Sequence, residues 1–167
     1  AATDGLLIHG ENFQALNLLQ EKYSEAVDCV YIHPPYNTGN DGFLYKDTYP
    51  HSSWLSMMQD RVSQTRRLMP ADSALYVSID DDEQSRLKTL LDDSFGEENF
   101  VTNVIWQKVY SPKNSAKYFS EDHDYILVYS KEKEDWDRNL LPRTEEQDSA
   151  YSNPDDDPRG PWKASDL

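Results

Sequence analysis

The chain has 167 residues, 37% of them apolar, which suits one domain of ordinary size with a hydrophobic core. Its net charge of −15 has the wrong sign for a free-standing nucleic-acid binder, because such proteins gain affinity from Lys and Arg at phosphates. We expect no signal peptide and no membrane span, and the single cysteine, Cys29, excludes an internal disulfide framework. These properties favour a cytoplasmic protein without membrane contact.

Short apolar runs alternate with amphipathic segments, which predicts an α/β fold with a mainly parallel sheet. The last two strands have no helical pattern between them, so we expect them to form a terminal antiparallel hairpin. Cys29 lies in an apolar run and is expected to be a buried small hydrophobe. The predicted strands are residues 6–8, 27–32, 74–79, 100–106 and 125–129.

Three helices are expected between these strands. Asn12 can cap the first, and the second, over residues 53–69, ends before Pro70. The third opens at residues 80–83, where Asp80 and Glu83 have the spacing of a capping box. Trp106 and Trp162, like Trp54, are interpreted as core or packing residues. The predicted core positions on the helices are Trp54, Met58, Val62, Met69, Leu87, Leu90, Leu91 and Phe95.

Regular patterning ends near Lys131. The stretch from Ser120 to Leu167 carries 14 acidic and 6 basic residues, and its later part is rich in turn-forming residues. We therefore divide the chain into residues 1–131, which hold the predicted sheet, and an acidic, turn-rich segment, residues 132–167.

A proline-rich loop follows the second predicted strand. Such a position, at the carboxyl end of a parallel strand, is where doubly wound folds place ligands. Pro34 and Pro35 stiffen the backbone, and the ring of Tyr36 can cover a flat substrate such as a nucleobase. The alternative is a proline-rich turn with a surface tyrosine.

The longer string favours the first interpretation. Tyr31-Ile32-His33-Pro34-Pro35-Tyr36-Asn37-Thr38-Gly39 resembles the Asp-Pro-Pro-Tyr-Asn-Thr-Gly motif of β-group adenine-N6 DNA methyltransferases, above all the modification subunit of Type III restriction-modification systems. The resemblance continues in order through residues 7–12, 78–83, 99–101, 122–129 and 157–162. It implies a Rossmann-like class I methyltransferase sheet, with residues 1–131 as the catalytic half and residues 132–167 leading toward a target-recognition region.

The resemblance also implies roles for the loop. An exocyclic amine is a poor nucleophile, and hydrogen-bond acceptors on its two protons localise its lone pair. The implied acceptors are the side chain at position 33 and the Pro34 carbonyl, held by the stiff Pro35, while Tyr36 stacks on an adenine flipped out of double-stranded DNA. S-adenosylmethionine is the implied cofactor, with His33 and Asn37 beside it.

His33 stands where the family has Asp. A neutral imidazole accepts one hydrogen bond and a protonated one accepts none, and the family's fixed negative charge is lost. Removing an aimed electrostatic group of this kind costs ~3–4 kcal/mol. We therefore expect strongly reduced or absent turnover. A metal role for His33 is disfavoured because no second His or Cys stands at ligand spacing.

A second departure concerns the cofactor. In this group a glycine-rich cofactor loop follows the catalytic half, and no Phe-x-Gly-x-Gly string occurs here. We therefore expect a fragment without the main S-adenosylmethionine pocket. The implied partners are DNA, a second methyltransferase subunit and a restriction subunit.

Residues 107–117 contain three lysines and no acid, interleaved with aromatics. This pattern is about equally typical of a DNA contact and of a merely solvated hairpin loop. Two functions stay open: a methyltransferase part, or a non-catalytic DNA- or partner-binding module of the same ancestry. A cytosine-N4 target is a less favoured variation, because that chemistry usually pairs with Ser at the first loop position. The predicted DNA contacts are Lys108, Tyr110, Lys113, Lys117 and Tyr118.

Overall fold

The computed structural model describes residues 4–39, 48–111 and 117–164. The chain divides into two compact units, Ala1–Trp136 and Asp137–Leu167. In the second unit, helix α4 (Glu145–Ser149) opens with a capping box formed by Thr144 and Gln147, and an isolated bridge pairs Ser152 with Trp162. No helix in the described ranges is long and apolar enough to span a membrane.

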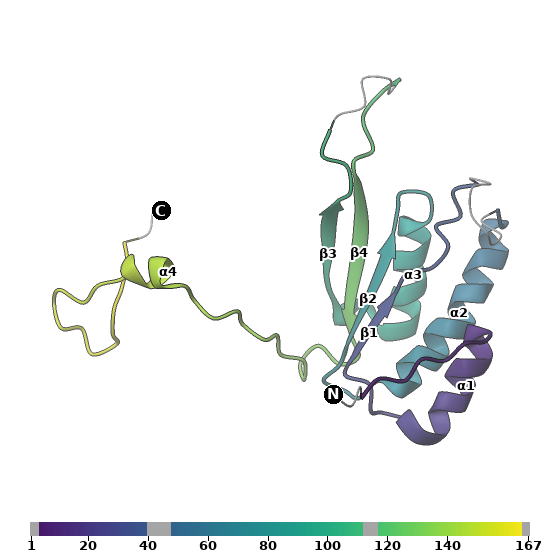
Figure 1. The fold of residues 1–167 in the computed structure, drawn as a ribbon, viewed down its shortest axis with the longest axis horizontal. Helices are drawn as coiled ribbons and strands as arrows, with labels where there is room; N and C mark the ends of the chain where they lie inside the picture. The colour runs from purple at the N-terminus through teal and green to yellow at the C-terminus, as the bar shows by residue number, and fades with distance from the viewer. Residues whose placement is uncertain (1–3, 40–47, 112–116, 165–167) are drawn as a thin grey trace. The chain divides into compact units, whose positions relative to one another are not determined.

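The first unit is built on a sheet with strand order β1-β2-β4-β3 (Figure 1). β1 runs parallel to β2, and β4 pairs antiparallel with both β2 and β3. The predicted α/β class and terminal antiparallel hairpin are confirmed. Because β4 lies between β2 and β3, it pairs antiparallel with β2 as well as with β3. The described sheet therefore has one antiparallel pairing in addition to the predicted hairpin. The strands are β1 (Cys29–Ile32), β2 (Ala74–Ile79), β3 (Phe100–Gln107) and β4 (His123–Ser130).

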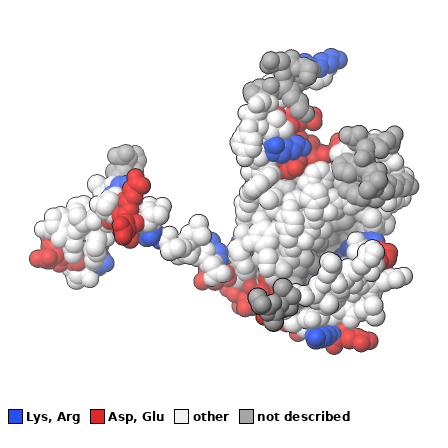
Figure 2. Space-filling model, viewed as in Figure 1, with Lys and Arg blue, Asp and Glu red and all other residues white. Residues whose placement is uncertain are grey.

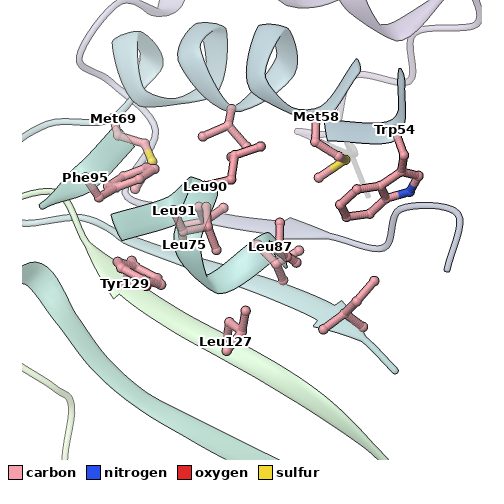
Figure 3. Close-up of a cluster of buried hydrophobic side chains, with 13 residues drawn as sticks. Trp54, Met58, Met69, Leu75, Leu87, Leu90, Leu91, Phe95, Leu127 and Tyr129 are labelled. Carbon is pink, nitrogen blue, oxygen red and sulfur yellow. The ribbon is translucent and has the colours of Figure 1, made fainter. Parts of the chain in front are cut away.

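Helices α1 (Asn12–Tyr23), α2 (His51–Leu68) and α3 (Gln84–Phe95) accompany this sheet. Figure 3 shows side chains of α2 and α3 filling the space above β2 and β4. Every predicted core position on α2, at its C-cap Met69 and on α3 is buried, because apolar residues recur there at helical spacing. Helix α1, which lies wholly within the described residues, has no buried residue. The strands contribute Leu75, Val77, Ile79, Leu127 and Tyr129 to the same core.

Several predictions about burial are wrong. Residues 6–8 form no strand, and Leu7 is 93% exposed. Cys29 is exposed because β1 is the end strand of the described sheet and has a neighbour on one side only. Trp106 and Trp162 are 59% and 43% exposed, so they are not core residues.

The predicted helix caps are also wrong in detail. Glu11, not Asn12, caps α1, and its carboxylate accepts a hydrogen bond from the Gln14 N–H at 3.0 Å. α3 begins at Gln84, and the side chain of Glu83 makes no capping hydrogen bond. Glu83 is instead completely buried, with its carboxylate turned away from the helix end.

Candidate active site

The loop of residues 33–39 leaves the carboxyl end of β1, as the sequence predicts. Pro34 is buried and His33 is exposed, and the His33 ring lies 5.0 Å from the Tyr36 ring, measured between centroids. The carbonyl of Pro35 accepts a hydrogen bond of 2.8 Å from the indole nitrogen of Trp54, at the start of α2. A fully buried side chain therefore fixes the second proline of the loop.

Asn37 fixes the far end of the same loop. Its backbone φ of +63° lies in the left-handed region, which Asn tolerates better than most residues. Its side-chain oxygen accepts from the Tyr49 N–H at 2.6 Å, and its side-chain nitrogen donates to the Tyr49 carbonyl at 3.0 Å. The side chain thus joins the loop to the segment that precedes α2.

One cavity, of about 340 Å³, lies at the face of the sheet where Tyr31 and Ser78 meet. The Tyr31 hydroxyl is 2.6 Å from the Ser78 hydroxyl oxygen. The rings of Tyr36 and Trp106 contribute aromatic walls, and Asp124 contributes a carboxylate. The full lining is Tyr31, His33, Tyr36, Ser78, Trp106, Asp124 and Ile126. We name this space the aromatic cavity.

A second cavity, of about 420 Å³, lies between β1 and helices α1 and α2. Its lining is mostly apolar, with Asn12, Arg61 and Thr65 as polar members. Arg61 forms an ion pair with Glu11 and a hydrogen bond with Asn12, at 2.7 and 2.6 Å. The apolar members include Leu16, Val30, Ile32, Pro34, Pro35 and Met57. We name this space the apolar cavity.

His33 and Tyr31 line both cavities. A group at position 33 can therefore contact one molecule in the aromatic cavity and another in the apolar cavity. Pro34 and Pro35 face the apolar cavity, Tyr36 faces the aromatic cavity, and Asn37 lines neither.

The aromatic cavity favours the neutral form of the Tyr36 phenol. Burial and, secondarily, the Asp124 carboxylate raise the pKa of Tyr36 to about 12. Tyr36 therefore stays protonated and uncharged at neutral pH, which suits a ring that covers a flat, uncharged group.

The predicted DNA contacts lie on the β3–β4 hairpin, except that Lys113 lies outside the described residues. Tyr110 and Tyr118 are 83% and 80% exposed, and the Lys117 ammonium lies 5.0 Å from the Tyr118 ring centroid. Lys108 is ion-paired with Asp124 at 2.7 Å. Figure 2 shows basic and acidic atoms side by side on this hairpin. The structure thus places the exposed rings of Tyr110 and Tyr118 on this hairpin. Lys108 is already ion-paired with Asp124.

Residues 27–165, most of the chain, match the DNA methylase family. The chain belongs to the DNA methylase family. The resemblance inferred from the loop is thereby confirmed, and the matched range contains the loop, the aromatic cavity, the hairpin and all of the apolar cavity's lining except Asn12 and Leu16.

Relatives and solved structures agree with the family. The StyLTI Mod subunit, a Type III restriction-modification enzyme of Salmonella typhimurium, is 35% identical over 95% of this chain and 29% of its own length. A probable HindVI Mod subunit of Haemophilus influenzae is 38% identical over 78% of this chain and 18% of its own length. The chain therefore spans less than a third of either relative. The solved structure of M1.HpyAVI with SAM matches 83% of this chain and 60% of its own, at a TM-score of 0.55 and 17% identity, which supports the fold.

Within this DNA methylase, sequence reasoning missed several residues of the site, and three of them carry aromatic or acidic groups far from the loop in sequence. Trp106 and Asp124 line the aromatic cavity although they lie far from the loop in sequence. Their register gives the reason: Trp106 is the β-partner of Asp124, so both lie at the same end of the hairpin. The third, Glu83, contacts Asn37. An acid that follows a strand was interpreted as a helix cap, and only the fold reveals its contact with the loop.

Proposed function

We propose that this chain is the catalytic region of a site-specific DNA methyltransferase of the Type III kind, which transfers a methyl group from S-adenosylmethionine to adenine N6 in double-stranded DNA. The observation that carries the proposal is that position 33 lines both cavities. Methyl transfer needs the amine held close to the methyl donor and in line with it, so the two binding sites must adjoin, as two cavities with a shared wall residue do. The family match and the two Mod subunit relatives support the same reaction class.

The aromatic cavity is the proposed site of the target base. A base inside a duplex cannot reach the methyl donor, so it must first be flipped out. The rings of Tyr36 and Trp106 offer stacking surfaces, which bind any base by its π-face. The Asp124 carboxylate accepts hydrogen bonds, as an exocyclic amino group requires.

The apolar cavity is the proposed site of part of the cofactor. Its volume lies within the range of small-molecule sites, and its apolar lining with a few polar groups fits a nucleoside and part of the methionine chain. Asn12 offers an amide for the polar edge of a nucleoside. When bound, S-adenosylmethionine supplies an electrophilic methyl group. Residues 33–35 wall the side of the cavity next to the base.

His33 limits this chemistry. Its ring is exposed and can offer one lone pair to the amine, while the Asp of the family offers a fixed charge as well. We propose that methyl transfer by this chain is strongly reduced for that reason.

Replacing His33 by Asp in the full-length protein tests the proposal. We expect methyl transfer from tritiated S-adenosylmethionine to DNA to rise about 100-fold or more, the usual effect of an aimed acceptor. The matched control is a His33→Asp, Tyr36→Ala double variant, which should lose most of that gain. Mass spectrometry of the nucleosides should detect N6-methyladenine, and N4-methylcytosine in its place would contradict the proposed target. No gain in either product would overturn the methyltransferase proposal.

A non-catalytic module is the second candidate, favoured by His33 and by the net charge of −15. Calorimetry separates the two. A methyltransferase part should bind S-adenosylmethionine or its demethylated product when the whole cofactor site is present, whereas a pure DNA- or partner-binding module should bind neither. In either case we propose that residues 132–167 lead toward a target-recognition region, and that a second methyltransferase subunit and a restriction subunit are partners.

A further inference from the structure

We propose that Glu83 is a positioning residue, whose buried carboxylate holds the catalytic loop in the shape that walls both cavities. The role of the loop in methyl transfer rests on the proposed function. The contact between Glu83 and the loop rests on the structure alone.

The carboxylate of Glu83 has two close partners. Its Oε1 atom accepts from the Asn37 side-chain nitrogen at 2.6 Å, and the Nδ1 atom of His51 lies 2.6 Å from the same oxygen. The Oε2 atom is buried without a hydrogen bond and lies 3.5 Å from the Arg86 guanidinium. Glu83 is completely buried, and an acidic group at such a position destabilises the fold unless its partners compensate.

The position of Glu83 in the chain shows that these partners are specific. Glu83 is the N-cap residue of α3, a position at which a side-chain oxygen, most often of Asp, Asn, Ser or Thr, accepts from the first backbone N–H groups of the helix. No such hydrogen bond forms here. The carboxylate points instead to a residue 46 positions earlier in the chain. The Glu83 side chain thus contacts the loop and makes no capping hydrogen bond.

Asn37 joins Glu83 to the rest of the loop. Its amide also bonds both backbone groups of Tyr49, so the side chain is held from two directions. The Pro35 carbonyl, two residues earlier, is bonded to Trp54. The segment between these anchors contains Tyr36, which lines the aromatic cavity. Glu83 from α3 and Trp54 from α2 thus hold the loop at both ends of the segment that carries Tyr36.

A charge exchange between Asn37 and Glu83 tests the proposal. Asn37→Asp places two carboxylates where the donor and acceptor now lie 2.6 Å apart, while Asp tolerates the same left-handed backbone. We expect amide hydrogen exchange in residues 33–39 to rise about tenfold in this variant. Adding Glu83→Gln supplies an N–H donor opposite the new carboxylate and should restore the part of the protection that depends on the contact between positions 37 and 83. The hydrogen bond to the Tyr49 carbonyl stays lost in both variants. Asp93→Asn, at an exposed acid of the same helix, is the control and should change nothing.

Kinetics in a His33→Asp background give the functional readout. Asn37→Asp should lower kcat about tenfold with the KM for DNA unchanged, because a loosened loop misplaces the base after binding. The double variant should recover part of that loss. A merely structural role would lower the melting temperature without this division between kcat and KM.

The outcomes separate the two proposals. If the loop exchanges at the native rate in Asn37→Asp, or if the double variant is no better than the single one, the role of Glu83 is refuted. If His33→Asp restores no methyl transfer, the proposed function fails, and hydrogen exchange still decides the contact. Should Asn37→Asp fail to fold, Glu83→Gln alone, compared with Asp93→Asn, should raise loop exchange about threefold. Equal exchange in these two variants would refute the role.

Discussion

The Lys108 ammonium, one residue after the end of β3, lies 2.7 Å from the Asp124 carboxylate on β4. Burial alone would lower the pKa of Lys108, but the charges of Asp124 and, more weakly, Asp80 raise it above its usual value. Lys108 therefore stays charged and partly compensates the carboxylate at the wall of the aromatic cavity. Its predicted contact with a DNA phosphate stays a prediction, and such a contact would have to compete with this ion pair.

Asp124→Asn should lower the pKa of Tyr36 from about 12 toward its usual value near 10. A nearby negative charge disfavours the phenolate, so its removal makes ionisation easier, while burial, the larger cause, keeps part of the shift. NMR titration of the tyrosine ring carbons measures the change. Asp93→Asn serves as the control for the lost net charge. An unchanged Tyr36 pKa in Asp124→Asn would contradict the electrostatic contact.

Lys117→Ala should weaken DNA binding and reduce the slope of log affinity against log salt by about 1, as the loss of one phosphate contact predicts. Lys22→Ala is a matched control, because Lys22 lies 5.2 Å from the Tyr23 ring just as Lys117 lies 5.0 Å from the Tyr118 ring. Fluorescence anisotropy with duplex DNA at several salt concentrations measures both slopes. Equal slopes in the two variants would place the DNA elsewhere.

Much of the first unit could be predicted because its patterns are strong. β2 coincides with the predicted strand, and α2 and α3 bury the side chains expected from their helical spacing. The strand predicted at Leu6 to Ile8 is absent, because three apolar residues in a row have no period that separates a strand from an extended segment. Strand pairing could not be predicted from local pattern either. The insertion of β4 beside β2 depends on contacts between residues about 50 positions apart.

The site was predicted as far as a local motif reaches. Residues 33–36 line the two cavities, as a compact motif at a strand end suggests. Trp106 and Asp124 join them only through the register of the hairpin. Glu83 has the same sequence features as a helix cap, and its buried contact with Asn37 requires the packing of α3 beside the loop. The sequence pattern thus favours helix capping as the role of Glu83, because it cannot reveal a partner 46 positions away in the chain.

Trp54→Phe should lower the free energy of unfolding by about 2–3 kcal/mol, because it removes a buried hydrogen bond and leaves a small void. Trp54 is completely buried, and its indole nitrogen donates to the Pro35 carbonyl. Urea denaturation measures the loss. The control is Trp106→Phe, at a side chain that is 59% exposed, with an expected change within about 0.5 kcal/mol. A loss at Trp54 no larger than that at Trp106 would mean that the loop anchor contributes little stability.

Asp80→Asn should stabilise the protein at pH 7.5 and leave it nearly unchanged at pH 3.5. Burial, assisted by the charges of Asp82 and Asp124, raises the pKa of Asp80 to about 6 from a usual value of 3.8. A carboxyl whose pKa is raised by folding binds its proton more tightly in the folded state, so its ionisation costs stability as pH rises from about 4 to about 6. Asn has no such ionisation, and its side-chain oxygen can keep the hydrogen bond that Asp80 accepts from the Asp82 N–H. Melting temperatures at the two pH values measure the effect, with Asp93→Asn as the control for net charge. A gain of equal size at both pH values would show that the ionisation of Asp80 is not its cause.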